Sequence, residues 1–211
     1  WVRLGDTLAE CGEYLADRGE DPAETWTRAE NAYGEAVGMA PDQAGGWVGR
    51  GYVRTLQAVR RMHAGDDARP AIAAALDDLD RAVDVDARSP LAWLGRGWAR
   101  ENRGQGARRA GEDPLPWLDG AIEDYGQSLA LDPSAAQAHV ARGTARLTRA
   151  TVRRGRGEPA EDDRHAAETD YAAAIELDPD LVSARVRRGS LEVERATAAW
   201  QRNDDPSPIH A

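Results

Sequence analysis

The sequence of 211 residues contains no phenylalanine and no lysine, and it has a single cysteine. One cysteine, Cys11, excludes an internal disulfide framework and a cysteine-rich zinc site. All 27 basic residues are therefore arginine, and 37 acidic residues bring the formal net charge to −10. Because a surface that binds phosphates needs excess positive charge, this balance argues against nucleic acid as a partner.

Long hydrophobic runs are also missing. No segment approaches the roughly 18 apolar residues of a membrane span, and no signal-peptide pattern opens the chain. We therefore expect no membrane partner and a cytoplasmic location. Because the chain begins at Trp1 and not at Met, we also expect it to be a fragment of a larger protein.

One set of residues recurs at multiples of 46 positions, with no gap anywhere in the chain. Self-similarity at a period of about 20–50 residues is typical of stacked repeat architectures. The period divides the 211 residues into about four and a half units. The recurring residues are Trp47 and Trp93; Gly51, Gly97, Gly143 and Gly189; Arg50, Arg96, Arg142 and Arg188; Asp78, Asp124 and Asp170; and Tyr33, Tyr125 and Tyr171.

Proline and the apolar spacing predict two helices in each unit. All eleven prolines fall into two narrow windows of the period, and proline breaks helix interiors but is tolerated in turns and first helical turns. Within residues 71–85, Ile72, Leu76, Leu79 and Val83 have the spacing of one helical face. No stretch alternates as a strand would, so we predict an all-α chain.

The pattern resembles the tetratricopeptide repeat family, in which Trp and Leu-Gly are followed by Ala, an aromatic residue and a closing Pro. Trp93 is followed, after two residues, by Arg96 and Gly97, so Arg takes the position of the family's Leu, and Ala121, Tyr125 and Pro133 complete the unit. The resemblance covers essentially the whole chain and implies a right-handed superhelical solenoid of antiparallel helix pairs. The family's period is about 34 residues, so each unit has about 12 extra residues, which lengthen the first helix, the loop after it, or both.

We expect a single repeat array over residues 1–211. Its units span approximately 1–43, 44–89, 90–135 and 136–181, and a partial unit over 182–211, which includes Trp200, caps the end. Each first helix is expected to end at a glycine, namely Gly19, Gly65, Gly111 or Gly157.

The recurring arginines and aspartates suggest ion pairs inside the helix stack. Arg96 and its equivalents precede the repeat glycine, and Asp124 and its equivalents recur on the second helix. We predict that they form partly buried pairs, because charges on solvated faces have no reason to keep a common register. The alternative, that both sets lie on solvated faces, stays open.

Acidic pairs, from Glu20–Asp21 to Asp204–Asp205, mark the predicted loops that follow the first helices. They fit either a site for a metal or a basic partner, or simple matching of charges to helix dipoles, which we favour. No loop has the spaced ligands of a calcium site.

We expect no catalytic residue, no cofactor and no metal ligand, and hence not an enzyme. The four histidines, His63, His139, His165 and His210, share no metal-ligand spacing and have no nucleophile arranged beside them in the sequence. Gly-Arg-Gly at residues 49–51 and again at 95–97 lies inside a predicted helix and follows no strand, so neither segment forms a phosphate loop.

The resemblance instead implies a scaffold that binds a protein or peptide partner on the concave face lined by the first helices. The family's carboxylate clamp uses Lys and Asn, and because the chain has no Lys, that clamp is absent in its usual form. Two alternatives remain: a self-association module that forms a homo-oligomer, or a regulatory repeat region of a larger bacterial signalling protein such as a Ser/Thr kinase. Carried over by register, the candidate groove residues are Val48, Tyr52, Leu94, Trp98, Glu101, Asn102, Val140, Thr144 and Leu147.

Overall fold

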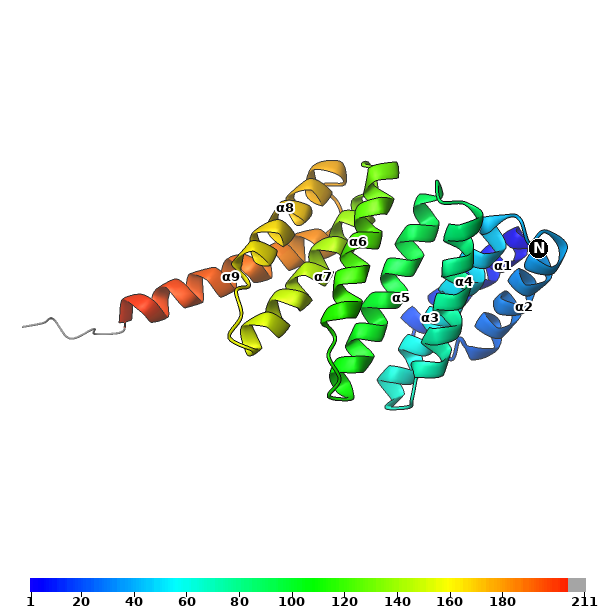
Figure 1. Cartoon of the computed structure of the whole chain (residues 1–211), viewed down its shortest axis with the longest axis horizontal. Coiled ribbons are helices and arrows are strands. Elements are labelled where there is room, and N and C mark those ends of the chain that lie inside the picture. The colour runs from blue at the N-terminus through cyan, green and yellow to red at the C-terminus, as the bar shows by residue number, and fades with distance from the viewer. Residues whose placement is uncertain (205–211) are drawn as a thin grey trace, which may run out of the picture.

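The computed structural model describes residues 1–204, without the side chains of residues 198, 199 and 201–204. Over this range the chain forms nine helices and no strand (Figure 1). The helices are α1 (Val2–Asp17), α2 (Ala23–Met39), α3 (Ala44–Ala64), α4 (Arg69–Val85), α5 (Pro90–Arg109), α6 (Leu115–Leu131), α7 (Ala136–Gly155), α8 (Glu161–Leu177) and α9 (Val182–Asp204).

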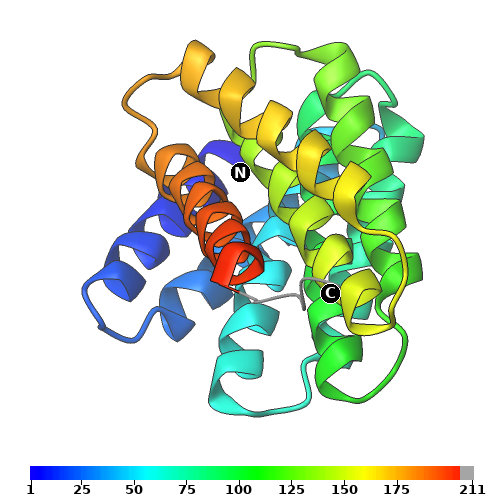
Figure 2. The same cartoon turned by 90° about the vertical axis from the view of Figure 1, so that its left-hand side faces the viewer.

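The helices pack as antiparallel pairs that stack along the chain. Each helix contacts its neighbours in sequence, and the odd-numbered helices also contact one another, α1 with α3, α3 with α5 and α5 with α7. The odd-numbered helices therefore form a continuous layer. Figure 2 looks along the stack from the α9 end and shows its winding. The predicted all-α, right-handed superhelical solenoid is confirmed.

Long helices account for the 46-residue unit. Helices α5 and α6 contain 20 and 17 residues, and only the short segments 110–114 and 132–135 connect them to each other and to α7. The extra residues therefore lengthen the helices and not the loops.

The turns that follow the first helices share one construction. The glycines predicted to end these helices, at positions 19, 65, 111 and 157, have φ between 74° and 84°, a left-handed conformation that only glycine adopts without strain. In the first three turns an aspartate two residues later accepts a backbone N–H, as Asp67 does from Arg69 and Asp113 from Leu115 at 3.0 Å. At these positions the acidic loop residues form turns that lead into the second helices. Asp205, in the last of the acidic pairs, lies outside the described residues.

The repeat glycines inside the first helices let the paired helix approach closely. A Cβ added to Gly97 would lie 2.8 Å from the Tyr125 ring, and one added to Gly143 would lie 2.8 Å from the Tyr171 ring. Tyr125 and Tyr171 are fully buried. Each aromatic ring thus fills the space that the missing side chain leaves, and this contact holds the two helices of a unit together.

The last helix departs from this arrangement. A Cβ added to Gly189 would meet nothing within 4 Å, and Val182, Val186 and Val193 are 61–69% exposed. Trp200, expected in the cap, is 68% exposed. Residues 205–211 of the expected cap lie outside the described residues.

Candidate partner-binding groove

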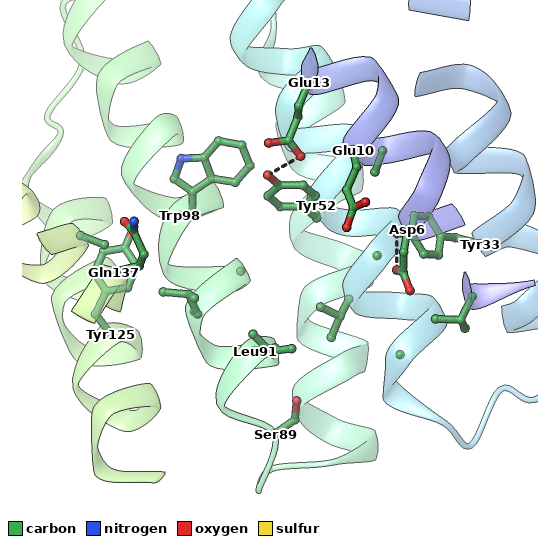
Figure 3. Close-up of a pocket in the computed structure, with 18 residues that line it drawn as sticks. Asp6, Glu10, Glu13, Tyr33, Tyr52, Ser89, Leu91, Trp98, Tyr125 and Gln137 are labelled. Atoms are coloured by element: carbon green, nitrogen blue, oxygen red, sulfur yellow. Dashed lines mark hydrogen bonds between the residues drawn. The ribbon is translucent and has the colours of Figure 1, made fainter. Parts of the chain in front are cut away.

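An open groove of about 720 Å³ runs along the layer of odd-numbered helices. Helices α1, α3, α5 and α7 supply most of its lining residues, and Tyr33 of α2 and Tyr125 of α6 also line it (Figure 3). The groove lies on this layer because α1, α3, α5 and α7 contact one another in series, so successive units present equivalent faces side by side.

The floor of the groove is apolar and aromatic. Val48 and Tyr52 of α3 lie beside Leu91, Leu94 and Trp98 of α5. The Tyr52 and Trp98 rings are 5.3 Å apart between centroids and tilted by 36°, a separation typical of interacting aromatic pairs. Leu91 is 62% exposed, so the floor offers apolar surface to whatever enters the groove.

One wall of the groove is acidic. Asp6, Glu10 and Glu13 of α1 line it (Figure 3), and their spacing places all three on one helical face. Asp6 accepts a hydrogen bond from the Tyr33 hydroxyl at 2.8 Å, and Glu13 accepts one from the Tyr52 hydroxyl at 2.9 Å. Burial raises the pKa of both tyrosines, and the neighbouring carboxylates raise it further. Both phenols therefore stay protonated donors at neutral pH.

The structure brings together four of the nine candidate groove residues, namely Val48, Tyr52, Leu94 and Trp98. Thr144 and Leu147 lie further along α7, outside the groove lining, where Thr144 donates to the Val140 carbonyl at 2.8 Å and Leu147 packs on the core.

The other three candidates, Glu101, Asn102 and Val140, are buried, so they do not face a partner. Glu101 accepts a hydrogen bond from Tyr125 at 2.9 Å, and Asn102 donates one to the Trp98 carbonyl at 2.9 Å. Both residues face the interior of the stack.

Sequence reasoning missed the acidic wall, although the repeat register contained a signal for it. Asp6 lies 46 positions before Tyr52, and Val2 lies 46 positions before Val48. Extending the register by one unit toward the N-terminus would have placed Asp6 and Val2 in the groove. Leu91 and Gln137, which also line it, are 46 positions apart and share a register position that the candidate set did not include.

The predicted ion pairs are present in three units. Arg50 lies 2.7 Å from Asp78, Arg96 lies 2.7 Å from Asp124, and the equivalent pair in α7 and α8 is as close. The aspartate side chains are at most 4% exposed. The fourth arginine, Arg188 on α9, pairs with Glu192 of its own helix instead.

A second arginine, four residues after the first, completes each site. Arg54 lies 2.8 Å from Asp78 and Arg100 lies 2.8 Å from Asp124, so each aspartate lies between two guanidinium groups. Arg146 completes the third site at 2.7 Å from its aspartate. Arg54, Arg100 and Arg146 also recur every 46 positions, so the repeat register contains a signal for the second arginine as well. These arginines point from the first helices to the second helices and away from the groove.

The repeat tryptophans pack on the first arginine of each site. The guanidinium carbon of Arg50 lies 5.0 Å from the centroid of the Trp47 ring, and that of Arg96 lies 4.7 Å from that of Trp93. The Trp93 indole donates to the carbonyl of Ala87 at 2.8 Å. Each tryptophan thereby ties its helix to the preceding turn, which is a structural role.

Within residues 1–204, no group of three or more His, Cys, Asp or Glu could hold a metal ion. Over the same part of the chain, no helix has the length and apolarity needed to cross a membrane. His210, one of the four histidines considered above, lies outside the described residues.

This architecture is similar to that of several solved structures. No protein-family model matches the sequence, and the search of curated proteins finds no match. Among solved structures, TTC0263, a thermophilic TPR protein of Thermus thermophilus, aligns over 91% of this chain and 97% of its own, at 21% identity and a TM-score of 0.60. A crystal structure of MamA aligns over 88% of this chain and 84% of its own at 16% identity, with a TM-score of 0.55. The chain therefore has the tetratricopeptide-repeat fold.

Proposed function

We propose that this protein is an interaction scaffold that binds a protein or peptide partner in the groove along α1, α3, α5 and α7. The observation that carries the proposal is the Tyr52–Trp98 pair in the floor of an open groove of about 720 Å³. Large aromatic side chains in a concave apolar site are the residues that dominate binding energy in protein interfaces.

The construction of the groove supports this proposal. Helix pairs held by buried aspartates and by glycine–tyrosine contacts form a rigid frame. A rigid frame loses little conformational entropy when a partner binds. The exposed Leu91 and the half-buried Trp98 and Tyr52 are therefore presented to a partner in a fixed arrangement.

A quantitative pull-down from a lysate of the source organism tests the proposal, comparing the wild-type chain with Trp98→Ala. We expect the variant to lose partners that the wild type recovers, since truncation of a central aromatic anchor costs about 2 kcal/mol or more in binding. Tyr14→Ala is the matched control, because Tyr14 is 61% exposed on α1 and does not line the groove. Equal recovery of all partners by Trp98→Ala would contradict the proposal.

Self-association is a second candidate, favoured by the uncovered face of α9. Val182, Val186 and Val193 are exposed there and follow one helical face with Gly189. Light scattering over a range of concentrations, on the wild type and on Val186→Glu, tests it. A wild type that stays monomeric at all concentrations would remove this candidate.

We also propose that the units divide at residues 43, 89, 135 and 181, and that they form one array. The starts of α3, α5, α7 and α9 directly after these positions support this division. A regulatory role inside a larger signalling protein stays a prediction from the resemblance, and the sequence that flanks this segment in its gene would test it.

A further inference from the structure

The charge of the groove is entirely of one sign. Asp6, Glu10 and Glu13 line it, and within the described part of the chain no arginine or histidine is among its lining residues, although the sequence contains 27 arginines. A random draw from this composition would place both signs in a site of this size. The groove therefore differs in charge from the rest of the surface.

The arginines of α3 and α5 that lie in the repeat register are engaged elsewhere. On α3, Arg50 and Arg54 both bind Asp78 of the paired second helix, and on α5, Arg96 binds Asp124 in the same way. These contacts direct the positive charge to the opposite side of each first helix. These guanidinium groups therefore do not compensate the carboxylates of α1.

The hydrogen bonds to the acidic wall leave its charge in place. Asp6 and Glu13 each accept one bond from a neutral tyrosine hydroxyl, and a carboxylate has about four acceptor positions. Glu10, between them on the same face, is exposed. The wall can therefore accept further donors, and guanidinium or ammonium groups are the donors that also supply opposite charge.

The floor next to this wall adds aromatic and apolar contacts to the negative charge. Tyr52 bonds Glu13 through its hydroxyl and lies against Trp98 through its ring. A cation that approaches Glu13 therefore also comes near two aromatic rings, whose faces attract cations. Leu91 and Leu94 continue the floor away from the wall and offer contact to aliphatic side chains.

We infer that the groove takes a cationic amphipathic peptide segment of a partner protein, with arginine or lysine at the α1 wall and apolar side chains on the α5 floor. This inference rests on the proposed function and names the chemistry of the partner. The groove repels an acidic peptide segment, because like charges that approach without compensation are destabilising.

Fluorescence anisotropy with two labelled synthetic peptides tests the inference. The first is a helical peptide of leucine, alanine and arginine, and the second has glutamate in place of every arginine. We expect the arginine peptide to bind about tenfold or more tightly than the glutamate peptide at low salt, and the difference to shrink at high salt.

Variants separate groove binding from general attraction to an acidic protein. We expect the double variant Glu10→Gln with Glu13→Gln to weaken the arginine peptide about fivefold or more, and Trp98→Ala to weaken it also. Glu123→Gln with Glu176→Gln is the matched control, because both glutamates are exposed, on α6 and α8, and neither lines the groove, and it should leave binding unchanged. Circular dichroism melting verifies that each variant is folded.

Three outcomes would overturn the inference. Equal binding of both peptides, weakened by Trp98→Ala, would refute the charge preference and leave the proposed function standing. If Glu123→Gln with Glu176→Gln weakens the arginine peptide as much as the double variant of the wall does, the peptide is attracted to the whole acidic surface and not to the groove. Binding of neither peptide would refute the inference, while the pull-down still tests the proposed function independently.

Discussion

The buried aspartates of the second helices are the residues on which each unit depends most. Asp124 is 1% exposed in its side chain and lies between Arg96 and Arg100, at 2.7 and 2.8 Å. A buried charge is tolerated only when it is paired and hydrogen-bonded, because its desolvation is costly. The three charges therefore depend on one another, and removal of one leaves the others uncompensated.

We predict that Asp124→Ala lowers the free energy of unfolding by about 3–5 kcal/mol, the cost of breaking a buried pair from one side. Asp80→Ala is the control, because Asp80 also contacts Arg96, at 2.9 Å, but is 55% exposed. An exposed pair contributes about 0–1 kcal/mol. Chemical denaturation measures both, and a loss of only about 0–1 kcal/mol for Asp124→Ala would show that the buried pair does not stabilise the unit.

A second residue-scale prediction concerns Glu101, whose carboxyl is buried beside Tyr125. Burial raises the pKa of Glu101 above its ordinary value of 4.5. A carboxyl with a raised pKa binds its proton more tightly in the folded state. The stability that this contributes is present below pH 4.5 and is lost as the pH rises through the raised pKa.

Glu101→Gln has no such titration, so we expect its stability relative to the wild type to increase as the pH rises from about 4 toward about 8. Thermal melting of both proteins across this range gives the difference at each pH. A constant difference would mean that the pKa of Glu101 is not raised.

At the scale of helices, the distance between the two members of a unit is set by glycine. Gly97 permits contact between α5 and the Tyr125 ring of α6, and a Cβ there would also lie 3.2 Å from the Ala121 carbonyl oxygen. This oxygen belongs to the backbone of α6, so it cannot rotate away from an added side chain as a flexible side chain could. Gly189 has the same position in the sequence period, but nothing lies within 4 Å of a Cβ added there.

We predict opposite results for the same substitution at these two positions. Gly97→Ala lowers the free energy of unfolding by about 1–3 kcal/mol, as overpacking of a buried contact does. Gly189→Ala raises it by up to about 1 kcal/mol, because alanine is the better helix former and meets no neighbour. Differential scanning calorimetry on both variants checks this, and destabilisation by Gly189→Ala would contradict the uncovered face of α9.

At the scale of the whole molecule, the repeat period made the fold predictable. Two proline windows per period and a fixed glycine register leave little choice other than stacked helix pairs. The ion pairs could be predicted for the same reason, because Arg96 and Asp124 and their equivalents keep a constant separation in three units. Helix lengths could not be predicted in the same way, since sequence periodicity alone does not separate a longer helix from a longer loop.

The groove was only partly predictable. Trp98 and Tyr52 follow from the register, but Glu101 and Asn102 are covered in the assembled stack. The position of a residue on a helix predicts the direction of its side chain. It does not predict which neighbouring element covers that side chain. The acidic wall lies in the first unit, where Asp6 takes the position that Tyr52 and Trp98 hold in later units. Departures from the repeat therefore carry the specific chemistry of the groove.

Site-specific photo-crosslinking tests most directly whether the partner binds on the inner layer of odd-numbered helices. A photoreactive amino acid replaces Leu91, which is 62% exposed in the groove, or Leu131, which is 40% exposed at the end of α6 and does not line it. We predict that partners recovered from the lysate crosslink at position 91 and not at position 131. Crosslinking at position 131 without crosslinking at position 91 would contradict the account.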